Sequence, residues 1–236
     1  MGKEAVLTIR KNFYRPDPDL VKLFPRLPTG YLADVQGRRG APDCGIWPLF
    51  DVEPFAGTAV TVKTVPNDNL APYAALDLLK AGDVMLIATE DWTGSAVIGD
   101  LIVGMFKNAG VLGVVTDGAV RDLTGLIKVG LPVYARGTTA NSPQKNGPGS
   151  VGLPITIGGV IVHSGDLVVA DRDGVVVLPR QQIPEAARKI EAIRDKETKI
   201  EMEIAKGMIM PDWVKEVLSS GQVQYVDQEK NNGKGN

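Results

Sequence analysis

The 236-residue sequence has a single cysteine, Cys44, and a single histidine, His163. One cysteine excludes an intramolecular disulfide and a thiolate metal cluster, a pattern typical of proteins in a reducing cytoplasm. One histidine excludes a multi-histidine zinc or iron site within one chain. We therefore expect that any metal bound by this chain has oxygen ligands.

Long hydrophobic runs and an excess of charge of one sign are also missing. No apolar stretch approaches the roughly 20 residues needed to cross a bilayer, and the N-terminus lacks an apolar run of signal-peptide length. The 26 basic and 28 acidic residues give a net charge of -2, which provides no field for holding nucleic-acid phosphates. We expect a cytoplasmic protein that binds neither membranes nor nucleic acids.

The residues that are present favour a globular α/β fold. Hydrophobic residues make up 44% of the chain, enough for a substantial core. Segments rich in β-branched residues alternate with segments of helical spacing. The predicted strands are 57–64, 83–88, 111–117 and 131–136, and the predicted helices are 19–24, 29–34, 73–80, 101–109 and 123–129.

The second half of the chain is predicted to begin with a long loop, 137–154, rich in proline and glycine. Four short strands between residues 155 and 178 follow, and a long amphipathic helix begins near Pro184. No break separates two domains. We expect a single domain over residues 1–236, with an N-terminal arm (1–28), a C-terminal helical region (183–220) and a disordered tail (227–236).

The segment from Gly99 to Asp122 is the strongest candidate for a site. Gly99 and Asp100 precede a predicted helix, and Arg121 and Asp122 follow a predicted strand and a turn in which Gly118 can take a positive φ. The helix carries the chain away from Gly99, and the strand brings it back. We therefore expect two carboxylates and one guanidinium to face a common cleft.

Each of these charged residues has two interpretations. Asp122 suits a hard divalent ion such as Mg²⁺, but an exposed pair with Arg121 is equally compatible with the spacing. Asp100 suits a carboxylate that orients metal-bound water, or an N-cap of the helix that begins at Leu101. Arg121 suits a substrate carboxylate or an enolate oxygen, or a structural salt bridge. Backbone amides at Leu101 and Ile102 would add affinity for an anion.

Two further charged residues carry little signal by themselves. Lys145 lies in the long loop, where a lysine is usually solvated, and Glu197 lies in an acidic run of the C-terminal helix, where a solvated face is typical. Gly94, Gly99 and Gly104 do not have the spacing of a dinucleotide fingerprint, which argues against a nucleotide cofactor and a methyltransferase.

Several motifs resemble those of a known family. The sequence is similar to 4-hydroxy-4-methyl-2-oxoglutarate/4-carboxy-4-hydroxy-2-oxoadipate aldolases, a superfamily that also contains the regulator of ribonuclease E activity A. The order of motifs from about Thr29 to Pro179 is specific. The sequence also keeps the pattern that separates aldolases from members with an incomplete site: Asp100, then twenty intervening residues, then Arg121 and Asp122. The other matching motifs are 81–84, 113–122, 131–136, 158–160, 165–167 and 171–179.

This resemblance implies a fold and an assembly. The fold is an α/β, α-β-β-α layered domain with a β/β/α swivelling-type core, assembled as a homotrimer or hexamer with sites at subunit interfaces. By similarity, Asp122 holds Mg²⁺ or Mn²⁺ and Asp100 supports the shell of the metal. By the same similarity, Arg121 binds the pyruvyl part of an oxo acid. The start of the helix, with Gly99 and the backbone amides of Leu101 and Ile102, binds the same part.

The same resemblance raises Lys145 as a contact to the distal carboxylate and Glu197 as a metal-shell group from across an interface. It implies a class II pyruvate aldolase that cleaves a 4-hydroxy-2-oxo dicarboxylic or tricarboxylic acid to pyruvate and an oxo acid. Oxaloacetate decarboxylation is an expected side activity, because it passes through the same enolate. The alternative is a non-catalytic binding protein that regulates a ribonuclease.

Overall fold

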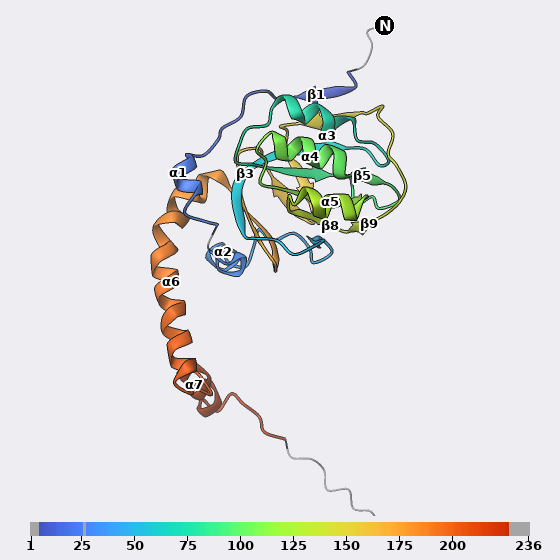
Figure 1. Ribbon diagram of the computed structural model, residues 1–236. Coiled ribbons are helices and arrows are strands. Elements are labelled where there is room, and N and C mark those ends of the chain that lie inside the picture. Colours follow the sequence, from blue (N-terminus) through green and yellow to red (C-terminus); the bar gives the residue numbers. More distant parts are fainter. Residues whose placement is uncertain (1–4, 26, 227–236) are drawn as a thin grey trace, which may run out of the picture. The chain divides into compact units, whose positions relative to one another are not determined.

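The computed structural model describes residues 5–25 and 27–226. It divides into two compact units, with the boundary between Ile190 and Glu191. The first unit contains the sheets and most of the helices (Figure 1). The second contains most of a long helix and one further helix. The expectation of one domain with a helical C-terminal region stays a prediction.

A large sheet organises the first unit. Within the described residues its strands follow the order β1-β10-β3-β4-β6-β8-β2. Strand β13 pairs with the first half of β3, on the same edge as β10, and it also pairs with β14. The strands are β1 (Leu7–Ile9), β2 (Trp47–Pro48), β3 (Phe55–Thr64), β4 (Asp83–Ala88), β6 (Gly113–Thr116), β8 (Val133–Ala135), β10 (Gly149–Val151), β13 (Leu167–Asp171) and β14 (Gly174–Leu178).

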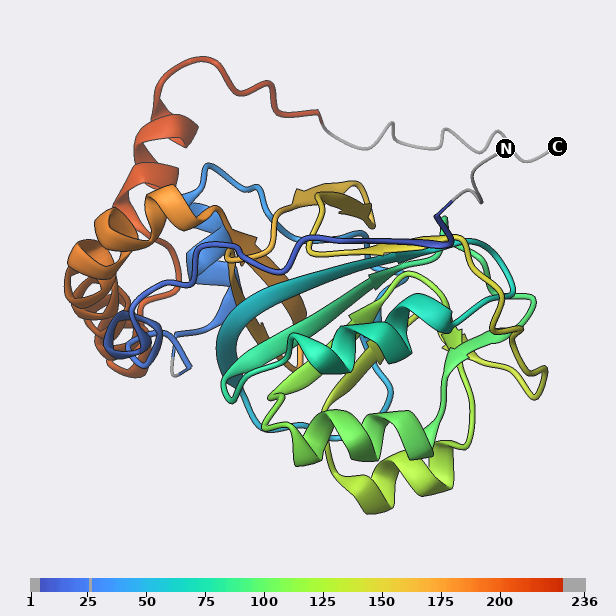
Figure 2. The same ribbon diagram turned by 90° about the horizontal axis from the view of Figure 1, so that it is seen from above.

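Four neighbouring strands of this sheet, β3, β4, β6 and β8, run parallel. Parallel neighbours need crossover connections, and short helices provide them. Figures 1 and 2 show these helices on one face of the sheet. They are α3 (Leu70–Ala74) with the 3-10 helix η1 (Ala75–Asp77), α4 (Asp100–Asn108) and α5 (Leu123–Val129). The predicted α/β class is confirmed.

Alternation along β4 separates two hydrophobic cores. Met85 and Ile87 pack with the helices α3 to α5, whereas Val84 and Leu86 pack with the opposite side. That opposite side is covered by the hairpin of β11 (Ile155–Ile157) and β12 (Val160–Val162) and by β13 and β14. A third cluster joins β13 and β14 to α2 (Thr29–Val35) and to the first turns of α6 (Ile183–Ala205).

The described part of the predicted N-terminal arm is attached to this body. Strand β1 adds to the sheet in parallel with β10, and α1 (Pro18–Val21) follows. Between them, Arg15 forms an ion pair with the buried carboxylate of Asp83 and donates to the carbonyl of Leu78. A buried carboxylate needs such a partner, so this pair fixes the arm against the start of β4.

A second, smaller sheet lies beyond the carboxyl ends of the main parallel strands. It contains β5 (Ala96–Ile98), β7 (Ala119–Val120) and β9 (Gly137–Thr138), which pair in parallel in that order. Each follows one main strand along the chain: β5 follows β4, β7 follows β6, and β9 follows β8. These strands, and β10 within the predicted loop 137–154, are absent from the sequence prediction.

Two local expectations are wrong. The helix predicted at 73–80 begins at Leu70 instead and ends as 3-10 helix at Asp77, because the carboxylate of Asp68 accepts a hydrogen bond from the Leu70 amide and starts the helix earlier. Gly118 does not take a positive φ. A Cβ at Gly118 would lie 2.8 Å from Oγ1 of Thr89, so close packing requires this glycine.

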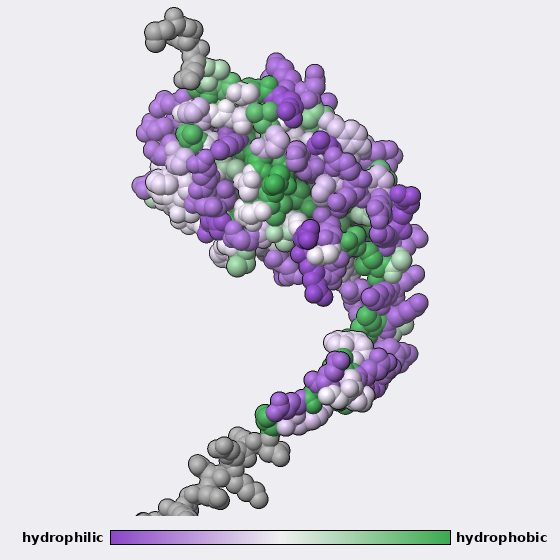
Figure 3. Space-filling model, turned by 180° about the vertical axis from the view of Figure 1, so that it is seen from behind, coloured by the Kyte–Doolittle hydropathy of each residue, from purple (hydrophilic) through white to green (hydrophobic). Residues whose placement is uncertain are grey.

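The C-terminal part of the described chain is helical. The 3-10 helix η2 (Arg180–Gln182) leads into α6, and α7 (Asp212–Ser219) follows. The long helix predicted from Pro184 is thus present. The predicted disordered tail, 227–236, lies outside the described residues. None of the described helices is long and apolar enough to cross a membrane, and hydrophilic side chains cover much of the surface in Figure 3 around a central hydrophobic patch.

Candidate functional site

The candidate site lies where the three strands of the small sheet end. Gly99 follows β5, Arg121 follows β7, and the segment from Thr139 follows β9. Backbone hydrogen bonds hold these ends together: the Arg121 amide donates to the Ile98 carbonyl at 3.0 Å, and the Thr139 amide donates to the Val120 carbonyl at 2.9 Å. The carboxyl ends of parallel strands are a common place for ligand sites in α/β folds.

Arg121 contacts its neighbour Asp122 and the loop that follows β9. Its Nε lies 3.2 Å from Oδ2 of Asp122, and its guanidinium NH1 donates a hydrogen bond of 2.7 Å to the hydroxyl of Ser142. The side chains of Arg121 and Asp122 are 38% and 44% exposed. Both charged groups are therefore ordered by partners yet open to a ligand.

Asp122 has an unusual backbone. It is the N-cap residue of α5, with φ 61° and ψ 43°, and its carboxylate makes no capping hydrogen bond. A left-handed conformation is uncommon for a residue with a side chain, although aspartate tolerates it better than most. Such local strain clusters at functional sites, and here it directs a carboxylate away from its usual capping role.

The structure corrects one interpretation of Asp100. Gly99, not Asp100, is the N-cap of α4, because the Gly99 carbonyl accepts the first helical hydrogen bond, from the Val103 amide. Asp100 is the first residue of the helix, and its carboxylate lies against Gly125 in α5, where an added Cβ would collide with it. The carboxylate of Asp100 is thus placed between α4 and α5 rather than on its own helix terminus.

The N-terminus of α4 forms one wall of the site. Within the described residues, no side chain caps it. The first amides of a helix have no partner inside the helix and carry partial positive charge, so they favour an anion. A Cβ built at Gly99 would lie 2.7 Å from Oδ2 of Asp122 and 3.1 Å from Cγ of Arg121. The absence of a side chain at residue 99 lets both charged residues approach the helix.

These groups line one cavity of about 180 Å³. The structure brings together every predicted site residue except Glu197, and it adds others that the sequence analysis did not single out. Its charged side chains are two carboxylates and two cations, so their charges offset one another. The lining residues are Asn69, Tyr73, Ile98, Gly99, Asp100, Leu101, Ile102, Arg121, Asp122, Ser142, Pro143 and Lys145.

Lys145 reaches the cavity from the long loop. Its ammonium nitrogen lies 5.2 Å from the centre of the Tyr73 ring, a cation–π distance. Asn69 is buried, and its Oδ1 has no hydrogen-bond partner among the described residues. An unpaired buried polar atom is costly, and Asn69 is one of the residues that line this cavity. No local pattern marks Asn69, Tyr73 or Ser142, because long-range packing brings them here.

Glu197 belongs to the second unit, on α6. It has an interaction partner within the chain. Its role as a metal-shell group from a neighbouring subunit stays a prediction.

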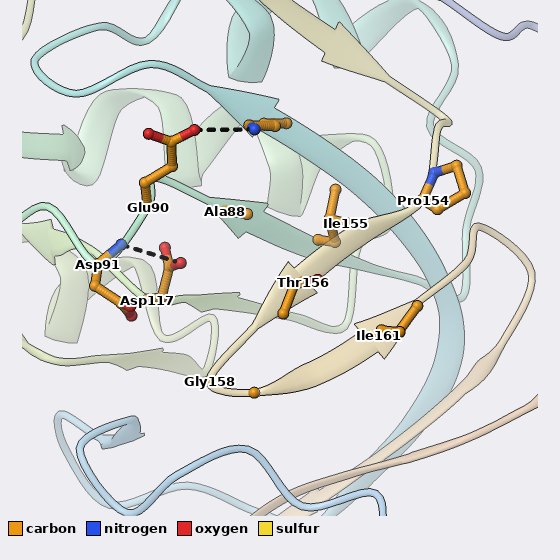
Figure 4. Close-up of a pocket in the computed structure, with 11 residues that line it drawn as sticks. Ala88, Glu90, Asp91, Asp117, Pro154, Ile155, Thr156, Gly158 and Ile161 are labelled. Carbon is orange, nitrogen blue, oxygen red and sulfur yellow. Dashed lines mark hydrogen bonds and ion pairs between the residues drawn. The ribbon is translucent and has the colours of Figure 1, made fainter.

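A larger hollow, of about 430 Å³, lies between the hairpin β11–β12 and the ends of β4 and β6 (Figure 4). Its charged groups already have partners. Glu90 pairs with Lys63 at 2.9 Å, and Asp117 accepts hydrogen bonds from the Thr89 amide (2.6 Å), the Thr89 hydroxyl (2.9 Å) and the Asp91 amide (3.3 Å).

The Asp117 bonds explain the turn that leads to β5. Glu90 and Asp91 both have positive φ, 60° and 59°, and the Asp117 carboxylate gathers the amides on either side of Glu90. Burial raises the pKa of Asp117, more than these hydrogen bonds lower it. Asp117 therefore supports the path to Gly99, and its carboxylate is structural.

The oxygen ligands in the cavity wall include carboxylates, which suit a divalent cation. Within the described residues, no group of three or more His, Cys, Asp or Glu side chains could hold a metal ion. Mg²⁺, however, keeps several waters and often uses only one or two carboxylates. Asp100 and Asp122 supply two carboxylates in the wall of one cavity. These residues fit a largely hydrated Mg²⁺ or Mn²⁺.

Comparison with known protein families matches residues 20–177 to the family described as RraA-like, Aldolase/RraA. The match covers more than half of the chain. The chain belongs to this RraA-like family. The resemblance inferred from the motifs between residues 29 and 179 is thereby confirmed.

Relatives of this RraA-like chain bear two kinds of name. A protein of Halalkalibacterium halodurans named "Putative 4-hydroxy-4-methyl-2-oxoglutarate aldolase" is 36% identical over 164 residues, 70% of this chain and 78% of the relative. The RNA-processing inhibitor RraA from Thermus thermophilis is 29% identical, with a TM-score of 0.60 over 65% of this chain and 93% of that one. Streptomyces coelicolor RraAS2, described as an unusual member of the RNase ES inhibitor RraA protein family, is also 29% identical, with a TM-score of 0.70 over 80% and 100%.

Proposed function

We propose that this RraA-like protein is a divalent-metal-dependent lyase that cleaves a 4-hydroxy-2-oxo acid with two or three carboxylates into pyruvate and a second oxo acid. The observation that carries the proposal is the convergence of Arg121, Asp100 and Asp122 at the N-terminus of α4, in one cavity. A site for anion binding and carboxylates suited to a hard cation are both needed for this chemistry.

The pyruvyl end of the substrate binds at the helix start. Its C1 carboxylate accepts hydrogen bonds from the amides of Leu101 and Ile102, where the helix dipole favours an anion. The guanidinium of Arg121, already oriented by Ser142 at 2.7 Å, donates to the 2-oxo oxygen. A planar guanidinium stays charged and can donate two parallel hydrogen bonds, so it both orients and polarises this group.

Cleavage breaks the bond between C3 and C4. The proton of the C4 hydroxyl leaves through water held by the Asp100 carboxylate, and C4 becomes the carbonyl carbon of the released oxo acid. The electron pair of the broken bond passes to C3 and the 2-oxo oxygen, which gives the enolate of pyruvate. Arg121 stabilises its negative oxygen, and protonation at C3 completes pyruvate.

The metal is part of this proposal, with Asp122 holding it and Asp100 contacting its water shell. When bound, Mg²⁺ or Mn²⁺ supplies Lewis acidity at the 2-oxo oxygen and lowers the pKa of coordinated water. The charges of the cavity support this assignment. Arg121 and Lys145 offset Asp100 and Asp122, so a substrate with two carboxylates is attracted more strongly when a divalent cation is also present.

The far end of the substrate lies toward Lys145 and Asn69. The Lys145 ammonium would pair with the distal carboxylate, and the unpartnered Oδ1 of Asn69 would accept a hydrogen bond from a substrate hydroxyl. A site that hydrogen-bonds a substrate hydroxyl discriminates strongly against analogues that lack it. These two residues thus supply selectivity, whereas Arg121 and the two aspartates supply the chemistry.

Oxaloacetate would be decarboxylated in the same site. Breaking its C3–C4 bond releases carbon dioxide and leaves the same pyruvate enolate. We also propose a homotrimer or hexamer as the working assembly, in which Glu197 of a neighbouring subunit completes the metal shell.

Pyruvate release tests the proposal. Purified protein is mixed with 4-hydroxy-4-methyl-2-oxoglutarate or with oxaloacetate, in Mg²⁺ or in EDTA. We expect release in Mg²⁺ and its loss in EDTA, with restoration by added Mg²⁺ or Mn²⁺. A folded protein that releases no pyruvate from either acid in Mg²⁺ would contradict the proposal.

A non-catalytic regulator of a ribonuclease is the second candidate, favoured by the two solved relatives whose names describe inhibitors of RNA processing. The complete set of Asp100, Arg121 and Asp122 in one cavity favours the lyase. Inhibition of a purified ribonuclease by this protein, together with no pyruvate release, would favour the regulator.

A further inference from the structure

Two segments that are far apart in the sequence line the cavity side by side. One is the start of α3, with Asn69 and Tyr73, and the other is the loop with Ser142 and Lys145. A surface loop needs specific contacts to hold a side chain in one place, because its backbone has few neighbours. The position of Lys145 therefore depends on what attaches its loop to the α3 segment.

Asp68 makes this attachment. It is 4% exposed and does not itself line the cavity. Its Oδ2 accepts hydrogen bonds from the amides of Asn146 (2.6 Å) and Gly147 (3.0 Å), while its Oδ1 accepts one from the Leu70 amide (2.8 Å). One carboxylate thus binds both segments, and charge-assisted hydrogen bonds of this kind are about twice as strong as neutral ones.

Backbone hydrogen bonds continue the contact. The Gln144 amide donates to the Asn67 carbonyl at 2.7 Å, and the Asn69 amide donates to the Gln144 carbonyl at 3.0 Å. Lys145 lies between two anchored residues, Gln144 and Asn146. Its backbone is therefore fixed on both sides, and its ammonium is held over the Tyr73 ring.

We infer that Asp68 is a positioning residue, which sets where Lys145 and Asn69 lie relative to Arg121 and so selects substrates that carry a distal carboxylate. This inference rests on the proposed function. A role in capping α3 would need only Oδ1, which meets the Leu70 amide. The two amides at Oδ2 come from the loop, 78 and 79 residues away in the chain, and they have no part in a helix cap.

Asp68→Asn tests this role without changing the size of the side chain. If the amide oxygen stays with Leu70, the amide nitrogen faces two N–H donors and the loop loses both bonds. The control is Asp77→Asn, since Asp77 is nearby in the chain and exposed, with a long contact of 3.8 Å to Lys11 as its ion pair. Circular dichroism and thermal unfolding establish that both variants are folded.

Two reactions separate the two ends of the site. Cleavage of 4-hydroxy-4-methyl-2-oxoglutarate uses both ends, whereas exchange of the pyruvate methyl protons in deuterium oxide, followed by NMR, uses only the pyruvyl end. In Asp68→Asn we expect the KM for cleavage to rise about tenfold to hundredfold, the scale of a misplaced binding group. The ratio of cleavage efficiency to pyruvate exchange should fall by a similar factor. In Asp77→Asn both reactions should match the wild type.

An equal loss of cleavage and exchange in Asp68→Asn would overturn the inference, because it would indicate a general structural role. Equality with Asp77→Asn would also overturn it. Amide hydrogen exchange at residues 144–147 provides a readout without turnover: it should be faster in Asp68→Asn only. If the wild type catalyses neither reaction, the proposed function and the selectivity role fail together, and unchanged amide exchange would overturn the attachment itself.

Discussion

Arg121 and Asp122 are neighbours in the sequence, and the 3.2 Å contact between Nε and Oδ2 keeps their charged groups together at the end of β7. Adjacent side chains on a regular strand point to opposite faces. Here the positive φ of Asp122 breaks that alternation, so both groups line the same cavity. This local geometry is the basis of the proposed chemistry.

Replacing Arg121 with lysine tests the need for a planar donor. Arg121→Lys keeps the charge but loses the parallel N–H donors and weakens the contact with Ser142. We expect kcat for pyruvate release to fall about hundredfold or more, as on removal of a single oxyanion donor. The free energy of unfolding should change little, because Arg121 is partly exposed.

The matched control for that variant is Arg172→Lys, since Arg172 is exposed and pairs with Asp51 at a different surface. Its pyruvate release should equal that of the wild type. Near-normal turnover in Arg121→Lys would remove Arg121 from the chemistry.

Replacing either of two glycines in the α4 region with alanine should have opposite effects on activity. Gly99 has φ -141°, which any residue can adopt, but a methyl group there would meet the carboxylate of Asp122. Gly99→Ala should therefore fold and lose about tenfold or more in pyruvate release. Gly104 lies within α4 with open space around a built Cβ, so Gly104→Ala should keep its activity.

Chemical denaturation distinguishes the two variants further. Alanine is favoured over glycine inside a helix by about 1 kcal/mol, so Gly104→Ala should be more stable than the wild type by roughly that amount. If Gly99→Ala released pyruvate as fast as Gly104→Ala, the close approach of Asp122 to the helix start would not matter for function.

The convergence of Asp100, Arg121 and Asp122 was predicted from the sequence, whereas the small sheet that places them was not. One helix and one longer strand lie between Asp100 and Arg121. Local sequence patterns predict both elements, and a helix followed by a strand brings Arg121 and Asp122 back near Asp100. The strands β5, β7 and β9 have only two or three residues each, too few for a hydrophobic period to be recognised. Their pairing depends on the larger sheet beneath them.

The other half of the cavity could not be predicted from local patterns. Asn69 and Lys145 line the same cavity because Asp68 accepts hydrogen bonds from backbone amides of a distant loop. Every residue except proline has a backbone amide, so the sequence does not indicate which amides bind Asp68. The prediction that Asp100 is the N-cap of α4 was wrong because of another long-range contact. Aspartate is a good N-cap, but the preceding glycine can come closer to Arg121 and Asp122, and the helix begins there instead.

Asp117 predicts a specific dependence of stability on pH. Burial raises its pKa above the ordinary value of 3.8, so the folded protein binds this proton more tightly than the unfolded chain does. The contribution of Asp117 to stability therefore falls as pH rises from about 3.8 through the folded-state pKa, and is constant above it.

Asp117→Asn should remove this contribution, and its free energy of unfolding should decline less over that pH range than that of the wild type. Urea unfolding at a series of pH values measures the difference. Asp173→Asn, at an exposed turn position, is the control and should follow the wild-type profile. Parallel profiles for the wild type and Asp117→Asn would contradict the effect of burial.

The most direct measurement of the central claim is metal-dependent pyruvate release by Asp122→Asn beside the wild type and Asp173→Asn. Asparagine preserves the size of the side chain but removes the charge that we propose binds Mg²⁺. With 4-hydroxy-4-methyl-2-oxoglutarate as substrate and Mg²⁺ titrated from zero, we expect Mg²⁺-dependent pyruvate release in the wild type and Asp173→Asn. Asp122→Asn should lose it by about hundredfold or more. Equal release by all three proteins, or release by the wild type that EDTA does not abolish, would contradict the account.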